Sequence, residues 1–271
     1  MTHEPTSAEV GTMYDQQTDL LSEALGGSIH LGYWNVPAEE QDVPSAANRM
    51  TSQVADRLAL MPGQLILDVG CGNGRPALHI ATHYDVHIKG ITISNYQLEL
   101  ADAMLRDKLT AGSATFEFAD AMEPLPFDAA SFDGAYAIEA LSHISDKSAA
   151  LAQVARVLRP GGRLVIADLF VDEDGGGADS QALARISQAF ELPTFCTGEQ
   201  YQSLIEKAGL AVIDFLDVRD HVRPGYKFVA EALQKKADVV DGVAGEQLHR
   251  SALDLAQLEK LGYALITATR A

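Results

Sequence analysis

The amino-acid sequence predicts an α/β fold: a doubly wound, mostly parallel sheet with helices on both of its faces. Two observations lead to this prediction. Short apolar segments that fit buried parallel strands alternate along the chain with segments of helical periodicity. In addition, residues 65–74 (LILDVGCGNG) read as a strand followed by a glycine-rich turn, and Pro76 suits the first turn of a helix. Strand, turn and helix together build a nucleotide-binding crevice at the carboxyl end of a parallel sheet.

The expected elements follow one another in a regular order. Helices are expected to precede the glycine turn over residues 10–24 and 45–60, and later helices over 95–111 and 147–158. After the strand at residue 65, six further strands are expected at residues 86–93, 115–118, 132–138, 163–168, 211–218 and 263–269. Strands separated by helices at this rhythm predict a doubly wound, seven-stranded sheet.

The domain organisation is expected to be a core with a cap and a lid. Several apolar residues of the later helical segments, such as Ile186, Phe190 and Tyr226, suit an apolar ligand, although helix-on-sheet packing would explain at least half of them. The predicted ranges are 1–61 for an N-terminal helical and aromatic cap, 62–170 for the cofactor-binding core, 171–210 and 222–262 for helical lid insertions, and 211–221 and 263–271 for the remaining strands.

Composition and charge limit the partners. The chain has 271 residues, 47% of them hydrophobic, and a formal net charge of −18. The electrostatic field of this negative charge repels phosphate groups, which argues against nucleic acid or an anionic membrane as a partner. No apolar run approaches the roughly 20 residues that a spanning helix needs. Cys71 and Cys196 lie far apart, which fits a reducing compartment. We expect a cytoplasmic protein that acts on a small molecule, and the sequence leaves room for a homo-oligomer.

The spacing of the glycine turn decides between two cofactors. A dinucleotide fingerprint, G-x-G-x-x-G counted from Gly70, requires a third glycine where Arg75 stands, and the acid expected about 20 residues later is missing. The chain instead reads D-x-G-x-G-x-G from Asp68 to Gly74. This pattern resembles that of class I S-adenosylmethionine-dependent methyltransferases, whose fold is a Rossmann-like, seven-stranded sheet. The resemblance implies S-adenosyl-L-methionine as the cofactor.

The same resemblance implies the cofactor contacts. Asp68 would hold the ammonium group of the cofactor, directly or through water, and Gly70 and Gly72 would let the amino-acid tail lie against bare backbone. The segment Gly90–Ser94, which contains Thr92, resembles the second-strand signature of cyclopropane-synthase-like and small-molecule O-methyltransferases. In that group neutral side chains replace the usual acid at the ribose, and Gln97 would take this role.

Two further stretches complete the predicted cofactor site. Asp120 and Ala121 match the turn at which a carboxylate accepts from the adenine amino group. Residues 29–34 resemble an H-x-G-Y-W segment of one methyltransferase subgroup, whose aromatic residues close over the methionine end of the cofactor. This implies Tyr33 and Trp34 as contacts, with Tyr14 from the preceding helix; taken alone, Trp34 could equally be a packed interface residue.

The catalytic prediction comes from a narrower resemblance, to bacterial natural-product tailoring enzymes such as the rebeccamycin sugar O-methyltransferase. That group places a histidine after the fourth strand and an aspartate after the fifth strand near the acceptor hydroxyl, and these map onto His143 and Asp168. The group carries paired histidines, whereas Ser142 takes the first position here. His143 would act as a general base with Asp168 beside it, or it would be a loop histidine without a chemical role.

The expected function is methyl transfer to a hydroxyl of a small, largely apolar natural product, such as a glycoside, macrolide or polyketide, in secondary-metabolite tailoring. Two alternatives stay open: C-methylation of an isoprenoid or quinone, and a methyltransferase-like cyclase that binds the cofactor without transferring its methyl group. His79 and His83 lie four residues apart, but no further cluster of cysteine or histidine joins them, so no metal is expected.

Overall fold

The computed structural model describes residues 4–35, 42–105, 112–172, 178–237, 246, 250–251, 253–255 and 257–271. In this part of the chain seven strands form one sheet with the order β3-β2-β1-β4-β5-β7-β6. β7 is antiparallel to both of its neighbours, and the other pairs are parallel. This confirms the predicted seven-stranded, mostly parallel sheet. The strands are β1 (Leu65–Val69), β2 (His87–Thr92), β3 (Ser113–Phe118), β4 (Phe132–Ile138), β5 (Leu158–Val171), β6 (Leu210–Asp217) and β7 (Leu261–Arg270).

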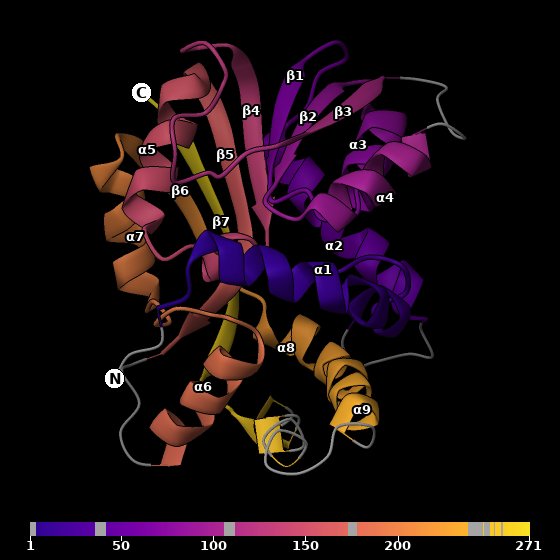
Figure 1. Cartoon of the computed structure of the whole chain (residues 1–271). Coiled ribbons are helices and arrows are strands. Elements are labelled where there is room, and N and C mark those ends of the chain that lie inside the picture. Colours follow the sequence, from indigo (N-terminus) through magenta and orange to yellow (C-terminus); the bar gives the residue numbers. More distant parts are fainter. Residues whose placement is uncertain are drawn as a thin grey trace.

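Helices cover both faces of the sheet, as predicted (Figure 1). The helices are α1 (Ser7–Ala24), α2 (Val43–Leu58), α3 (Arg75–Tyr84), α4 (Asn95–Leu105), α5 (Lys147–Val157), α6 (Ala178–Ala189), α7 (Gly198–Lys207), α8 (Arg219–Val222) and α9 (Tyr226–Ala237). There are also two short 3-10 turns: η1 (Leu141–His143), between β4 and α5, and η2 (Arg223–Gly225), between α8 and α9. None of the described helices is both long enough and apolar enough to cross a bilayer.

The alternation of side chains along the strands explains the two layers. In β1, Ile66 belongs to a buried cluster that includes Met50 of α2 and Ile80 of α3. Its neighbour Leu67 belongs to a second cluster that includes Leu151 of α5. Successive residues of a strand point to opposite faces, so an unbroken apolar strand must be covered on both sides.

The fifth strand is longer than expected. β5 begins at Leu158, directly after α5, because Arg159 precedes a proline and is disfavoured in the helical conformation. At its other end β5 stays paired with β7 as far as Val171, opposite Leu261. The sheet therefore continues past the ends of β1 and β4 into the region of the predicted lid.

The N-terminal helix is also longer than expected, since α1 begins at Ser7 rather than at residue 10. The Thr6 hydroxyl accepts from the Glu9 backbone N–H at 3.3 Å, and the Glu9 carboxylate accepts from the Thr6 N–H at 2.8 Å. This capping box satisfies two helix-end donors. Figure 1 shows α1 lying across the ends of the central strands, with α8 and α9 on its other side.

The predicted cap and lid ranges contain helices with two different positions. α7 packs against β6 and α5, and so belongs to the layers of the sheet. α9 contacts α1 instead, beyond the ends of the strands. The acidic, glycine-rich segment 173–177 and residues 238–245, both within the expected lid, lie outside the described residues. The division into core, cap and lid remains a proposal.

Candidate active site

The glycine turn after β1 depends on backbone conformations that favour glycine. Gly70 has φ +75° and Gly72 φ +53°. A Cβ at Gly70 would lie 2.5 Å from the Cβ of Ala140, and one at Gly72 would lie 2.5 Å from Cδ1 of Ile29. The backbone N–H groups of Gly70 and Cys71 both donate to the carbonyl of Ile91 at 2.9 Å. This turn therefore holds its shape on β2 and brings bare backbone to the edge of the sheet.

Asp68 lies buried at the end of β1, with 2% of its surface exposed. Burial raises the pKa of its carboxyl to about 7, although the hydrogen bond that it accepts from the Tyr136 hydroxyl at 2.7 Å acts in the opposite direction. A buried carboxylate is costly unless a cation or several donors compensate it. The side chain thus suits a ligand ammonium group.

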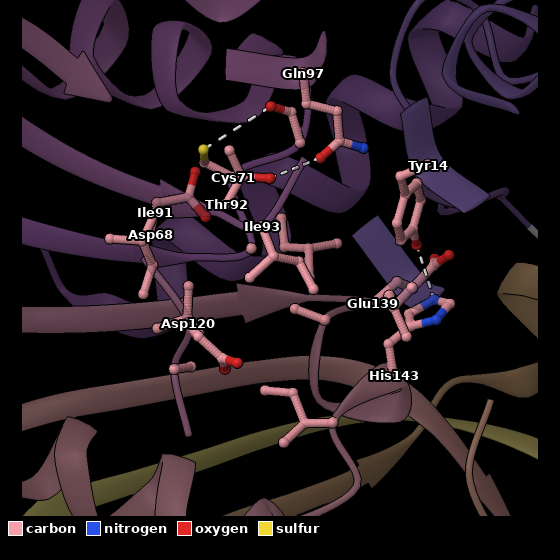
Figure 2. Close-up of a pocket in the computed structure, with 18 of the residues that line it drawn as sticks. Tyr14, Asp68, Cys71, Ile91, Thr92, Ile93, Gln97, Asp120, Glu139 and His143 are labelled. Atoms are coloured by element: carbon pink, nitrogen blue, oxygen red, sulfur yellow. Dashed lines mark hydrogen bonds between the residues drawn. The ribbon is translucent and has the colours of Figure 1, made fainter. Parts of the chain in front are cut away.

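A cavity of about 860 Å³, partly open to solvent, lies over this turn. Its walls come from α1, from the ends of β1, β2 and β4, and from the segment after β3. Figure 2 shows Asp120 on the opposite side of the cavity from Tyr14, Glu139 and His143. Eight of the ten predicted cofactor residues line it: Tyr14, Asp68, Gly70, Gly72, Thr92, Gln97, Asp120 and Ala121.

The polar side chains at the predicted ribose and adenine positions already have partners. The Thr92 hydroxyl donates to Oε1 of Gln97 at 2.9 Å, and Nε2 of Gln97 donates to the Thr18 hydroxyl at 3.2 Å. The Ser7 hydroxyl donates to Oδ2 of Asp120 at 2.5 Å. Because Ser7 and Thr18 both belong to α1, this helix is hydrogen-bonded to the predicted adenine contact and to the predicted ribose contact.

Tyr33 and Trp34 lie outside this cavity, unlike the other predicted cofactor residues. The Tyr33 ring stacks on His221 of α8 with centroids 4.2 Å apart, and Trp34 stacks on Phe228 of α9 at 5.7 Å. Nδ1 of His221 donates to the Trp34 carbonyl at 2.7 Å. A Cβ at Gly32 would lie 2.5 Å from that of Ala46, so glycine lets the segment pack closely on α2. In this structure the segment joins α8 and α9 to the N-terminal part of the chain.

A second cavity of about 570 Å³ adjoins the first. Four residues line both cavities: Tyr14, Ile29, Glu139 and His143. The second cavity is mainly apolar, and its remaining lining consists of Leu21, Leu25, Leu31, Ser142, Leu169, Ile186, Phe190, Leu192, Tyr226, Val229 and Leu255. Ligands bound in the two cavities would therefore meet beside Tyr14, Glu139 and His143.

His143 is held in one tautomer at this junction. Its Nε2 lies 2.8 Å from the Tyr14 hydroxyl, and its Nδ1 lies 3.4 Å from the carbonyl of Glu191. A carbonyl only accepts, so Nδ1 carries the proton and Nε2 accepts from Tyr14. Burial lowers the pKa of His143 to about 4. The imidazole is therefore neutral near pH 7 and has a lone pair on Nε2.

Asp168 takes a different position from the one expected beside the histidine. It is 1% exposed and lies behind the cavities, where its carboxylate accepts from the backbone N–H of Ser142 at 2.9 Å and of Leu169 at 2.8 Å. Between the described side chains of Asp168 and His143 no hydrogen bond forms. Asp168 instead holds the start of η1, the turn that carries His143. Burial raises the pKa of this carboxyl.

Glu139 is a site residue that the sequence reasoning did not single out. It follows β4, has φ +50°, and its Oε1 accepts from the Leu31 N–H at 2.7 Å and from the Tyr263 hydroxyl at 2.9 Å. Burial raises the pKa of its carboxyl to about 8. Its position was a usable signal, since an acid directly after a central parallel strand opens onto the crevice.

The described residues contain no group of three or more histidine, cysteine, aspartate or glutamate side chains arranged to hold a metal ion. The rings of His79 and His83 lie together, with centroids 4.2 Å apart, on α3. Nε2 of His79 is 3.2 Å from the Ser52 hydroxyl, and Nδ1 of His83 donates to the His79 carbonyl at 2.7 Å. The first contact connects α3 to α2, and the second lies within α3.

Comparison with known proteins gives a consistent result. The family described as "Methyltransferase domain" matches residues 67–166. The chain is 48% identical over 270 residues to the O-methyltransferase resE of Aspergillus sclerotiorum, covering 100% of both chains. It is 34% identical over 281 residues to the 27-O-demethylrifamycin SV methyltransferase of Amycolatopsis mediterranei, covering 98% of each.

A solved structure shows the same fold at similar sequence identity. The [4+2]-cyclase SpnF superposes with a TM-score of 0.81 and 33% identity, covering 98% of this chain and 96% of the other. The strand order, the glycine turn with its buried acid and the full-length O-methyltransferase relatives agree with one another. This chain therefore belongs to the class I S-adenosylmethionine-dependent methyltransferases.

Proposed function

We propose that this enzyme methylates a hydroxyl group of a small, uncharged, largely apolar natural product, such as a polyketide, macrolide or glycoside, in secondary-metabolite tailoring. The observation that carries the proposal is the contact between the two cavities. The cavity over the glycine turn, which includes the buried Asp68, and the mainly apolar cavity beneath α1 share Tyr14, Glu139 and His143. This arrangement suits a donor and an acceptor that react at a common wall.

The residues of the first cavity fit the cofactor. Asp68 offers a carboxylate for the ammonium group, the glycine turn offers open backbone for the amino-acid tail, and Asp120 offers an acceptor for the adenine amino group. When bound, S-adenosylmethionine supplies an electrophilic methyl group: the acceptor oxygen forms the O–C bond while the S–C bond breaks and leaves its electron pair on sulfur. The roles of these residues are part of the proposal.

The proton of the acceptor hydroxyl is proposed to leave through Tyr14 and His143. The Tyr14 hydroxyl already donates to Nε2 of His143 at 2.8 Å. An acceptor hydroxyl that donates to Oη of Tyr14 can lose its proton as the Tyr14 proton moves to Nε2. A histidine whose pKa is about 4 is a weak base, so its contribution should lie near the lower end of the roughly 10²–10⁴-fold that general bases give. Orientation, at roughly 7–11 kcal/mol, is the larger effect.

The proposal also includes the expected partners and the expected cellular compartment. The net charge of −18 disfavours nucleic acid and an anionic membrane as partners. Cys71 and Cys196 are both free thiols, which supports work in a reducing cytoplasm.

A cyclase that binds the cofactor without methyl transfer is the second candidate, because the [4+2]-cyclase SpnF matches almost the whole chain. Release of S-adenosylhomocysteine separates the two functions. We expect release when the enzyme meets a panel of glycosides, macrolactones and polyphenols, and calorimetry should show binding of S-adenosylmethionine but not of NAD. Consumption of an acceptor without S-adenosylhomocysteine would favour the cyclase instead.

A further inference from the structure

Two residues that line the second cavity carry buried hydroxyl groups. They are Oη of Tyr226, which is 2% exposed, and Oγ of Ser142, which is 6% exposed. Within the described part of the chain Oη of Tyr226 forms no hydrogen bond, whereas the Ser142 hydroxyl lies by the Asp168 carboxylate and helps to lower the pKa of that group by hydrogen bonding. Buried polar groups in native proteins are normally satisfied, so the unpaired hydroxyl of Tyr226, a residue that lines the cavity, indicates a ligand with a matching polar atom.

Both hydroxyls belong to the end of the cavity that adjoins the cofactor site. Ser142 directly precedes His143 in η1. Tyr226 begins α9, and after burial the charge of Glu139 is the largest influence that raises the pKa of its phenol. The remaining lining, from residues such as Leu21, Ile186 and Leu255, is hydrocarbon. The cavity therefore has one polar end, beside the proposed reaction site, and one apolar end.

This cavity also lacks a positive side chain for an anionic ligand. Among its described lining residues none is lysine or arginine. Its two titratable groups nearest the junction are neutral near pH 7, because burial raises the pKa of Glu139 to about 8 and lowers that of His143 to about 4. A phosphate, diphosphate or carboxylate would lose its hydration here without gaining a counter-charge.

We infer that Tyr226 and Ser142 select the acceptor: it is an uncharged, largely hydrocarbon molecule that carries a second neutral oxygen, a hydroxyl or carbonyl, close to the hydroxyl that is methylated. The Tyr226 and Ser142 hydroxyls bind that second oxygen, while the apolar end holds the hydrocarbon part. The inference rests on the proposed methyl transfer, since it takes the second cavity as the acceptor site.

The test uses three probes that differ in one group each: 4-hexylcatechol, 4-hexylphenol, and 6-(3,4-dihydroxyphenyl)hexanoate. Calorimetry on the protein saturated with S-adenosylhomocysteine measures their binding without requiring turnover. We expect 4-hexylcatechol to bind about tenfold more tightly than 4-hexylphenol, which lacks the second oxygen, because the phenol leaves the Tyr226 hydroxyl unpaired. The hexanoate should bind at least about tenfold more weakly than 4-hexylcatechol, since it brings a charge to the apolar end.

The variant Tyr226→Phe tests the assignment to a residue. It should weaken 4-hexylcatechol binding by roughly 2- to 12-fold, the value of one neutral hydrogen bond, and leave 4-hexylphenol unchanged. Ser142→Ala should do the same and serves if Tyr226→Phe does not fold. Tyr84→Phe is the matched control: it removes a phenol hydroxyl that donates to Asp56 at 2.8 Å, outside both cavities, and should leave all three affinities unchanged.

The outcomes separate this inference from the proposed function. Equal binding of catechol and phenol, equal losses for both probes in Tyr226→Phe, tighter binding of the hexanoate, or no binding of any uncharged probe would each overturn the inference. If the probes bind in the expected order, the recognition stands. In that case, absence of S-adenosylhomocysteine release with every hydroxylated acceptor would contradict the methyl transfer alone.

Discussion

The ionisation of Asp68 gives the sharpest prediction for cofactor binding. Burial raises its pKa to about 7, so in the free protein the carboxyl is about half ionised at pH 7 and about 1% ionised at pH 5. If the ionised form holds the ligand ammonium, S-adenosylhomocysteine should bind about 50-fold more weakly at pH 5 than at pH 7. This change corresponds to about 2.3 kcal/mol, at 1.36 kcal/mol per pH unit once the group is mostly protonated.

Calorimetric titrations of S-adenosylhomocysteine from pH 5 to pH 7 measure this dependence. His30 and His143 both have a pKa lowered by burial to about 4, so they stay neutral through most of this window. Asp68→Asn keeps an oxygen that can accept from Tyr136 but cannot ionise. Its affinity should be at least about 100-fold lower than that of the parent at pH 7, because an ammonium is then left without its counter-charge.

The two proteins should converge as the pH falls. At pH 5 most of the parent is neutral at Asp68, so the variant should differ little from it. Tyr136→Phe removes the hydrogen bond that lowers the pKa of Asp68, and should move the midpoint of the parent's curve to higher pH. A parent affinity that stays flat between pH 5 and pH 7, or an equal slope in Asp68→Asn, would refute the reasoning.

Three other perturbations have expected outcomes. His143→Ala should lower turnover by roughly 10²-fold and leave S-adenosylhomocysteine affinity within about threefold; a larger drop in affinity would show that the side chain supports the cofactor cavity. Asp168→Asn should lower turnover less than His143→Ala, because its amide oxygen still accepts from the Ser142 N–H; equal losses in steady-state assays would favour direct pairing with His143. The unliganded protein should lose thermal stability as the pH rises from about 6.5 to about 8, because buried Asp68 and Glu139 keep protons that the unfolded chain has released, whereas below about 6.5 the neutral, buried His30 and His143 have the opposite effect. Scanning calorimetry checks the sign, and a rise over this range would contradict it.

The core was predictable because its signals are local in the sequence. The apolar run of β1, the acid at its end and the glycines after it lie within ten residues, 65–74, and each has a backbone reason to be there. Eight of the ten proposed cofactor contacts line one cavity for the same reason: they follow the ends of adjacent parallel strands or face them from α1.

Contacts between segments that are distant in the sequence could not be predicted. Tyr33 and Trp34 stack on His221 and Phe228, almost 200 positions further along the chain, and nothing near residue 33 indicates these partners. For Asp168, the sequence places the residue near the end of a strand but not the direction of its side chain, which reaches the backbone of η1 instead of the imidazole. Glu139 directly follows the predicted fourth strand, but its left-handed backbone conformation appears only in the structure.

The helix α1 fixes the distance between two contacts on opposite sides of the cofactor cavity. Ser7 contacts Asp120 on one side and Tyr14 contacts His143 on the other, and the two residues are separated by two turns of the same helix. At a rise of 1.5 Å per residue, seven residues span about 10 Å, and a helix does not stretch. A ligand that moves the Ser7 end of α1 along the helix axis would therefore also move the phenol that faces the imidazole. If adenine binds at Asp120 and His143 accepts the proton, as proposed, the same helix connects the two, and an analogue that lacks adenine should align the acceptor hydroxyl less well even when its methyl donor is intact.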